Sequence, residues 1–150
     1  MHEAGVAGFF HVGVTVWDME ESLRFYRDGL GMTVLSDGIR PGPAVEPVTG
    51  VLPTDLRSVF LTVPGSSTQV ELFEYRGVDR ARSTLRPCDV GFAHMCLHIE
   101  DVVAMHARMV ELGYGSIRPP FVVEVGPHAG AVAVYLLDPN GFSVELFQAA

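Results

Sequence analysis

Lysine is absent from the 150-residue sequence, and all ten of its basic residues are arginine. A chain without lysine cannot form a Schiff base through a lysine amine, and it cannot build a Walker-type phosphate loop, which requires that residue. Eighteen acidic residues give a formal net charge of −8. This charge argues against nucleic acid or an anionic membrane as the main partner.

Cysteine and long apolar runs are also scarce. The two cysteines, Cys88 and Cys96, form neither a disulfide framework nor a CxxC motif. The longest apolar run, AGAVAVYLL, is too short to span a bilayer, and the N-terminal MHEAGVAGFF lacks the basic and apolar regions of a signal peptide. Because 48% of the residues are hydrophobic, we expect a packed core in a single cytoplasmic domain over residues 1–150.

Two landmarks occur twice in the same order, which indicates a duplicated module. The tetrapeptide VELF stands at residues 70–73 and again at residues 144–147. His11 and His94 each open an alternating apolar stretch, and an aspartate follows each histidine seven residues later. A single match could arise by chance, but two matches in the same order favour a duplication.

Both halves have the same expected order of elements, because alternating apolar segments predict strands and helical spacing behind an aspartate predicts a helix. In the first half the predicted strands are 9–17, 32–36, 57–63 and 68–75, with a helix over about 18–30. In the second half they are 91–99, 116–124, 130–137 and 142–148, with a helix over 101–112. Each half is therefore βαβββ, and the predicted fold class is α+β.

Two segments between these elements are predicted to lack regular structure. The stretch 37–55 holds four prolines and three glycines, and we expect a loop that forms a pocket wall or a lid. The polar, arginine-rich stretch 77–89 is expected to link module one, at about 8–76, to module two, at about 90–150.

Strand alternation separates two kinds of side chain. The aliphatic residues share one face, which must pack on helices, and the opposite face carries one histidine or glutamate in each of four strands: His11, Glu71, His94 and Glu145. A carboxylate in the middle of a strand is costly unless it is solvated, paired or bound to a metal. Imidazole and carboxylate ligands suit zinc, nickel, cobalt, manganese or Fe(II). A twofold relation between the halves would bring the four residues together as a metal site.

The chain resembles the vicinal oxygen chelate superfamily, which includes glyoxalase I, methylmalonyl-CoA epimerase, extradiol dioxygenases and bleomycin- or fosfomycin-resistance proteins. The segments that carry the resemblance are FFHVGVTVWDMEESLRFYRDGLGM, QVELFEY, GFAHMCLHIED and YLLDPNGFSVELFQ. The resemblance implies two paired βαβββ modules that form a cupped mixed sheet around a metal. It also implies that His11, Glu71, His94 and Glu145 bind one divalent ion per site, with zinc favoured over nickel, cobalt, manganese or iron, and that the chain forms a homodimer.

A set of two histidines and two glutamates resembles the glyoxalase I and epimerase branch of this superfamily. That branch implies a metal-dependent isomerase, epimerase or lyase that transfers a proton next to a carbonyl through a metal-bound enediolate. Either Glu145 or Glu71 would be the catalytic base. The implied substrate is a small α-hydroxyketone or α-oxo compound: a cyclitol ketone of the valiolone type, or a glyoxalase-type or methylmalonyl-CoA-type substrate.

Two other activities within the superfamily are alternatives. An extradiol-type dioxygenase would use Fe(II) with two histidines and one carboxylate, which leaves Glu71 without a ligand role. A drug-binding resistance protein would need no metal. The presence of all four ligand residues favours the isomerase or epimerase over both.

Six further residues are candidate substrate contacts: His98, Arg57, Phe60, Phe73, Tyr135 and His128. Each has a plainer interpretation. His98 would be a hydrogen-bonded core histidine, Arg57 a surface residue, and the aromatic residues core walls. His128 lies in a Gly/Pro turn that could cover a pocket. Cys96 is expected to be a small buried apolar residue, with a thiol role as the alternative.

Overall fold

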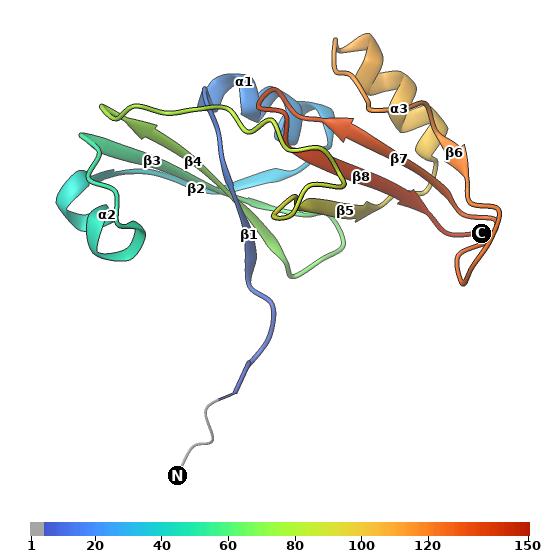
Figure 1. The fold of residues 1–150 in the computed structure, drawn as a ribbon, viewed down its shortest axis with the longest axis horizontal. Helices are drawn as coiled ribbons and strands as arrows, with labels where there is room; N and C mark the ends of the chain where they lie inside the picture. The colour runs from blue at the N-terminus through green and yellow to red at the C-terminus, as the bar shows by residue number, and fades with distance from the viewer. Residues whose placement is uncertain (1–4) are drawn as a thin grey trace. The chain divides into compact units, whose positions relative to one another are not determined.

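Two four-stranded mixed sheets form the framework of the protein in the computed structural model, which describes residues 5–150 (Figure 1). The first sheet contains β1 (His11–Thr15), β4 (Gln69–Arg76), β3 (Asp55–Thr62) and β2 (Thr33–Pro41), side by side in that order. Strand β1 is parallel to β4, and the other two pairs are antiparallel. The first four residues, part of the segment used above to argue against a signal peptide, lie outside the described residues.

The second sheet repeats this arrangement. It contains β5 (His94–His98), β8 (Ser143–Gln148), β7 (Val132–Leu137) and β6 (Phe121–Val122), in that order. Strand β5 is parallel to β8, and the remaining pairs are antiparallel. The α+β fold with a βαβββ order in each half is therefore confirmed, and the strand order shows that the repeat in the sequence is a repeat in structure.

The aliphatic face of each sheet is buried, as strand alternation predicts. In the first sheet the buried residues of this face include Val14, Val59, Leu61, Val70 and Leu72, and in the second Met95, Leu97, Val134, Leu136, Val144 and Leu146. In the second unit, helix α3 (Val102–Glu111) contributes fully buried Val102 and Met109. Its N-terminus is capped by Asp101, whose side chain accepts a hydrogen bond from the Ala104 N–H.

The first helix differs from a regular α-helix along half of its length. It begins as α1 (Met19–Leu23) and continues as the π-helix η1 (Arg24–Gly29), in which the Leu30 N–H donates to the Phe25 carbonyl. One extra residue per turn widens the helix and shifts which side chains face the protein. Phe25 and Tyr26, both in the π-helical segment, are fully buried.

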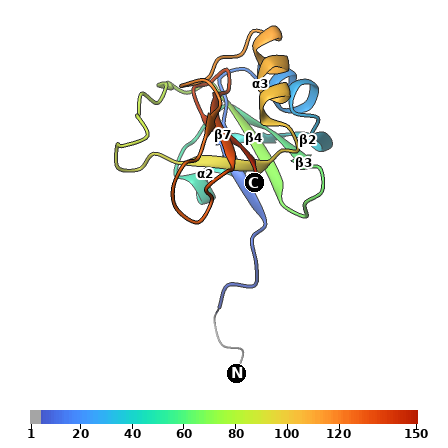
Figure 2. The ribbon, with the colours of Figure 1, turned by 90° about the vertical axis from the view of Figure 1, so that its right-hand side faces the viewer.

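The chain divides into two compact units, and the first helix groups with the second of them. One unit runs to Met19 and resumes over Gly31–Val78, and the other comprises Glu20–Leu30 and Asp79–Ala150. Within the second unit the rings of Phe25 and Tyr114 meet edge to face at 4.9 Å, and Arg108 donates to the Asp28 carbonyl. Figure 2 shows this helix in blue beside α3. Residues 20–30 thus belong to the second compact unit, whereas the predicted module one, at about 8–76, includes them and module two begins only at about residue 90.

The expected loop over 37–55 is wrong for most of its length. Strand β2 continues to Pro41 and is followed by helix α2 (Gly42–Thr49). Several of the prolines and glycines that suggested a loop mark the ends of this helix, with a proline in its first turn and Gly50 at its C-terminus with φ of +70°, whereas Pro47 lies inside the helix. Gly42 also lies so close to the Pro53 carbonyl that a side chain would not fit there.

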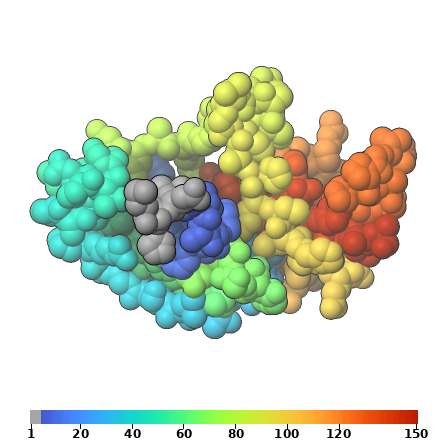
Figure 3. Space-filling view, turned by 90° about the horizontal axis from the view of Figure 1, so that it is seen from below, coloured from blue at the N-terminus to red at the C-terminus, as the bar shows by residue number. Residues whose placement is uncertain are grey.

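The segment between the modules is exposed. Residues 77–89 contain no helix or strand, and residues 81–88 are all exposed, visible in yellow-green in the space-filling view (Figure 3). Among residues 5–150, no helix is both long enough and apolar enough to cross a membrane.

Candidate functional site

One predicted histidine–glutamate pair lies in the first sheet. His11 begins β1, and Glu71 lies in β4 opposite Gly13. The His11 Nε2 atom is 3.2 Å from Glu71 Oε2. Glu71 is buried at 5% exposure, so its charge requires partners. The rings of Phe10 and Phe60 pack edge-on against the imidazole at centroid distances of 4.9 and 5.5 Å and hold its orientation.

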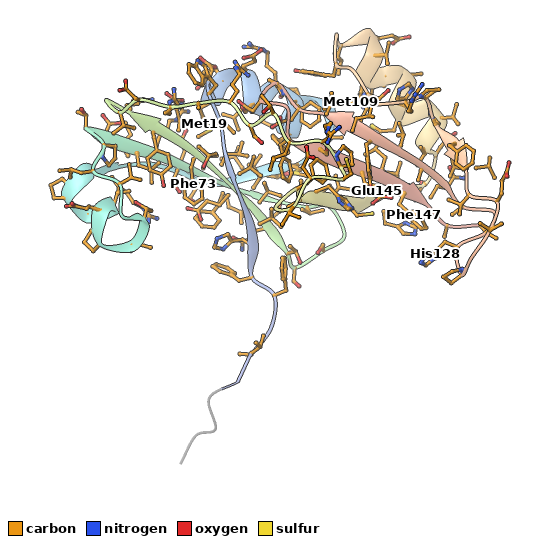
Figure 4. All side chains as sticks on the ribbon, in the orientation of Figure 1. Met19, Phe73, Met109, His128, Glu145 and Phe147 are labelled. Carbon is orange, nitrogen blue, oxygen red and sulfur yellow. The ribbon has the colours of Figure 1, made fainter. Side chains whose placement is uncertain are left out.

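The second pair has the same arrangement in the second sheet. His94 begins β5, and Glu145, labelled in Figure 4, lies in β8 opposite Cys96. The His94 Nε2 atom is 3.0 Å from Glu145 Oε2. The ring of Tyr135 lies 4.9 Å from that of His94. In both sheets the histidine side chain is about one third exposed, at 31% and 34%.

The two pairs occupy matching positions in the two ladders. In each sheet the glutamate lies across the parallel ladder from the residue two places after the histidine, and across the antiparallel ladder from an aromatic residue. This match arises because the repeat preserves both the spacing along each strand and the register between strands. Four residues that are scattered in the sequence are thereby sorted into two equivalent pairs.

The donor atoms of each pair fit a divalent transition metal. Two ligands that bind one ion at about 2.1 Å, with an angle of 90° to 110° between them, lie about 3.0–3.4 Å apart. The observed separations are 3.2 and 3.0 Å. Imidazole nitrogen and carboxylate oxygen are suitable donors for such an ion. Within residues 5–150, no group of three or more His, Cys, Asp or Glu side chains lies close enough together to hold a metal, so the predicted ligands meet as pairs.

The two glutamates differ in their neighbours. Glu71 Oε1 accepts a hydrogen bond of 2.6 Å from the buried hydroxyl of Ser58. Glu145 faces Cys96 and Tyr135, and the pKa of the Cys96 thiol is raised to about 11 by partial desolvation of its sulfur in an otherwise exposed residue, by the charge of Glu145 and by a hydrogen bond to it. Burial and the same carboxylate raise the pKa of Tyr135. Both groups are therefore neutral at pH 7.

Two of these neighbours were not identified correctly from the sequence. Ser58 was missed, because a lone serine in a strand has no chemical signature until the register of β3 and β4 is known. Cys96 was expected to be buried but is exposed. It alternates with Met95 and Leu97 on the opposite face of β5, which is the signal that could have placed it correctly.

The His11 ring has one atom without a hydrogen-bond partner. Its Nδ1 is buried and finds no partner among the described residues. Most metal-binding histidines fix their second nitrogen with a hydrogen bond. The edge-on packing against Phe10 and Phe60 is the feature that orients this ring instead.

Most of the predicted substrate contacts lie close to one of the pairs or on the same sheet face. Phe60 and Tyr135 contact the two histidines. The ring of Phe147, on the same face of β8 as Glu145, meets His128 at 5.4 Å and His98 at 6.3 Å, and Figure 4 shows His128 close to Phe147.

Phe73 and Arg57 have different surroundings. The ring of Phe73 fills the space beside Gly13, where a side chain would lie 2.9 Å from its edge. Arg57 alternates with Ser58 and therefore lies on the opposite face of β3 from Glu71. Its guanidinium donates two hydrogen bonds, of 2.9 and 2.7 Å, to Asp37 across β2 and β3. This pair lowers the pKa of the Asp37 carboxyl.

Three curated proteins resemble the chain over most of their length. A 2-epi-5-epi-valiolone epimerase from Actinomyces sp. is 29% identical, and the alignment covers 95% of this chain and 79% of that protein. An ethylmalonyl-CoA/methylmalonyl-CoA epimerase from Cereibacter sphaeroides is 31% identical, with coverage of 92% and 95%. A probable lactoylglutathione lyase from Synechocystis sp. is 27% identical, with coverage of 92% of both. These relatives are epimerases and a lyase.

The fold is shared with solved structures of the glyoxalase family. A glyoxalase family protein from Bacillus cereus superposes with a TM-score of 0.82 at 16% identity, covering 99% of this chain and 98% of that one. The family model described as Glyoxalase/Bleomycin resistance protein/Dioxygenase superfamily matches residues 8–146. With the match spanning both repeats and the fold shared throughout, the chain belongs to the Glyoxalase/Bleomycin resistance protein/Dioxygenase superfamily.

Proposed function

We propose that the protein is a divalent-metal-dependent epimerase or isomerase that transfers a proton next to a carbonyl of a small α-hydroxyketone or α-oxo compound. The observation that carries the proposal is the pair of register-matched His–Glu contacts, at 3.2 and 3.0 Å, on the two sheets. Either pair alone supplies two donors, whereas a catalytic zinc site uses about three protein ligands. An ion held by one pair therefore needs at least one further ligand.

The chemistry divides between the ion and the side chains. When bound, a divalent ion supplies a Lewis acid that polarises the substrate carbonyl and stabilises the negative charge that develops on it. His11 and His94 hold their nitrogens toward the site. One glutamate carboxylate accepts the proton from the carbon next to the carbonyl and returns it to the same or the adjacent carbon, and an epimerisation also requires a second group that donates a proton to the opposite face. Protein groups thus perform every proton movement.

The surroundings of the pairs support a small substrate. Phe60 and Tyr135 provide aromatic surface beside the histidines, and the proposed substrate contacts also include Phe147, His98 and His128. Phe73 belongs to the wall beside Gly13. Arg57 is left out of the proposed site, because it lies on the opposite sheet face and its guanidinium binds Asp37.

The relatives support the substrate class. The alignment with the valiolone epimerase extends over 95% of the chain, which favours a polyhydroxylated cyclic ketone. The absence of lysine and the net charge of −8 disfavour a substrate with the phosphates of coenzyme A. A cyclitol ketone is therefore the substrate that we would assay first.

The first test is the metal content of tag-free protein by mass spectrometry, beside the Glu71→Ala variant. We expect about one divalent ion per chain in the wild type and a sharply weakened site in the variant, because the variant loses a buried ligand. Glu111→Ala, which changes an exposed glutamate at the end of α3, is the control and should keep the metal. Deuterium uptake from heavy water into candidate hydroxyketones then tests the activity.

Three outcomes would count against the proposal. Iron that the Glu71→Ala variant still binds, with oxygen consumption on a catechol, would favour the dioxygenase. No metal after reconstitution with each candidate ion would favour a binding protein. Metal without deuterium exchange on any α-hydroxy- or α-oxo-carbonyl compound would contradict the reaction class.

A further inference from the structure

We infer that Tyr135 is a catalytic residue whose hydroxyl donates a hydrogen bond to the substrate oxygen on which negative charge develops during proton transfer. This inference rests on the proposed function, because it concerns the same reaction. It goes further by giving the hydroxyl a task that the aromatic ring alone cannot perform. It uses contacts within the second unit, together with a comparison of matched positions in the two sheets.

The ring of Tyr135 lies beside the second His–Glu pair. Tyr135 is the partner of Glu145 across β7 and β8, so both side chains leave the same face of the sheet. Strand β8 lies between β7 and β5, which places the outer two strands about 10 Å apart. The rings of Tyr135 and His94 nevertheless meet at 4.9 Å, so they lean toward each other over β8, the strand that carries Glu145. The phenol is therefore a neighbour of both donor groups of the pair.

The matching residue in the first sheet has the ring without the hydroxyl. Phe60 lies opposite Glu71, and its ring packs against His11 at 5.5 Å. This is the arrangement that Tyr135 has in the second sheet. A phenyl ring is thus sufficient to pack against the histidine of a pair, and packing does not account for the hydroxyl of Tyr135.

The two sheets also differ in what their hydroxyls bind. In the first sheet Ser58 donates to Glu71 at 2.6 Å, so the carboxylate already occupies that hydroxyl. The residue that matches Ser58 in the second sheet is Ala133, because each lies opposite the residue two places after the glutamate. The Tyr135 hydroxyl finds no hydrogen-bond partner among residues 5–150. It is therefore available to a ligand.

A phenol suits the charge that the reaction creates. Removal of a proton next to a carbonyl places negative charge on the carbonyl oxygen, and a hydrogen bond to a charged acceptor is stronger than one to a neutral carbonyl. A donor that is already in place therefore stabilises the transition state more than it stabilises the bound substrate. Phenols have a pKa of about 10, so the hydroxyl keeps its proton at neutral pH and acts as a donor.

Binding of a charged mimic tests the hydrogen bond without turnover. Acetohydroxamate, as its anion, carries negative charge over two neighbouring oxygens, whereas hydroxyacetone is a neutral hydroxyketone. In Co(II)-loaded protein we expect Tyr135→Phe to raise the Kd for acetohydroxamate about 10- to 100-fold, as loss of a hydrogen bond to a charged group does. The Kd for hydroxyacetone should rise by no more than about fivefold. Isothermal titration calorimetry measures both.

The same variant should separate turnover from metal binding. We expect Tyr135→Phe to lower kcat about 10- to 100-fold for deuterium exchange into the hydroxyketone that the wild type turns over. Its Kd for Co(II) should not change, because phenylalanine keeps the ring that packs against His94. Tyr114→Phe is the matched control, since it removes the hydroxyl of another tyrosine of the second unit, whose ring packs against Phe25. It should leave every readout unchanged.

The outcomes separate the inference from the function on which it rests. Wild-type protein that exchanges no deuterium into any candidate hydroxyketone would overturn the proposed function. Wild-type exchange with an unchanged kcat in Tyr135→Phe, or with equal changes in the Kd of the two probes, would overturn the role of the hydroxyl alone. A Kd for Co(II) that rises as much as the Kd for acetohydroxamate would also overturn that role, because Tyr135 would then act through the metal-binding pair.

Discussion

Tyr26 shows at the scale of one residue how burial changes a side chain. It is fully buried in the second unit, and its hydroxyl donates to Asp138 Oδ2 at 3.0 Å across 112 residues of sequence. Burial first, and then the nearby carboxylate, raises the pKa of Tyr26 well above its usual value of 10.0. The folded protein therefore keeps this proton at a pH at which the unfolded chain has lost it.

The shift predicts a loss of stability at alkaline pH. The contribution of Tyr26 is complete below about pH 10 and declines as the pH rises further, because the unfolded state then binds fewer protons than the folded state. Tyr26→Phe should cost about 1–3 kcal/mol at pH 7 through the lost hydrogen bond to a carboxylate. Its free energy of unfolding should fall less than that of the wild type between pH 9 and pH 11. Urea unfolding across this range is the measurement, and parallel pH curves would contradict the shift.

Gly13 explains at the same scale why two matched positions hold different residues. Its counterpart by register is Cys96, which also lies opposite the glutamate of its pair. At position 13 the ring of Phe73 occupies the space of a side chain. The corresponding Phe147 instead contacts His98 and His128. One ring orientation thus demands glycine, and the other leaves room for a thiol.

At the scale of elements, the turn between β7 and β8 depends on one buried aspartate. Asp138 Oδ1 accepts the backbone N–H groups of Asn140 and Phe142, both at 2.8 Å. Its Oδ2 accepts from the Tyr26 hydroxyl and from the Asn140 side chain, both at 3.0 Å. The sequence Asp-Pro-Asn-Gly predicts a turn here, and the hydrogen bonds show why the turn joins the first helix to the second sheet.

This arrangement predicts a large effect of a single substitution. Asp138→Ala removes the acceptor of one buried donor and of three part-buried donors at once, so we expect it to lower the free energy of unfolding by about 3 kcal/mol. Thermal or urea unfolding measures the change. Asp138→Asn keeps one acceptor oxygen for the backbone and should cost less than the alanine variant. Equal stability of the alanine variant and the wild type would show that the turn holds without its side-chain bonds.

Helix α2 is the clearest failure of local prediction among the elements. Residues such as Pro41, Gly42 and Gly50 are common in loops, but they are equally common at the two ends of a short helix. Composition alone cannot separate these two roles. The contact of Gly42 with the backbone at 53–54, which includes a hydrogen bond from its N–H to the Thr54 carbonyl at 3.1 Å, is what ends β2 and begins the helix.

At the scale of the whole molecule, the two His–Glu pairs lie in different units of the chain. We predict that metal binding by the whole chain depends on both histidines, so that His11→Ala and His94→Ala should each lose tight metal binding. We expect about one ion per wild-type chain and a Kd at least 100-fold higher in either variant. Equilibrium dialysis followed by metal analysis measures both. Two independent sites would instead leave each variant with half of the wild-type metal.

Much of the fold and part of the site followed from local patterns. The repeated histidine and the repeated VELF segment identified the strands that pair in each sheet, β1 with β4 and β5 with β8. The strand alternation placed the aliphatic residues correctly in the core. The four candidate ligands were found because a histidine or glutamate in the middle of an apolar strand is unusual. This signal can be seen in the sequence before the neighbours of these residues are known. Ser58 was not found, because a serine gains its meaning only from the carboxylate opposite it.

Apart from helix α2, the order of elements, the repeat and the face that each strand buries were determined by the sequence alone, since these depend on the spacing of neighbouring residues. The tertiary structure decided which residues meet. It placed residues 20–30 with the second unit, paired each histidine with its glutamate, and put Ser58 against Glu71 while leaving Ala133 in the matching place. These contacts join residues far apart in the chain, and their register depends on packing, which no local pattern encodes.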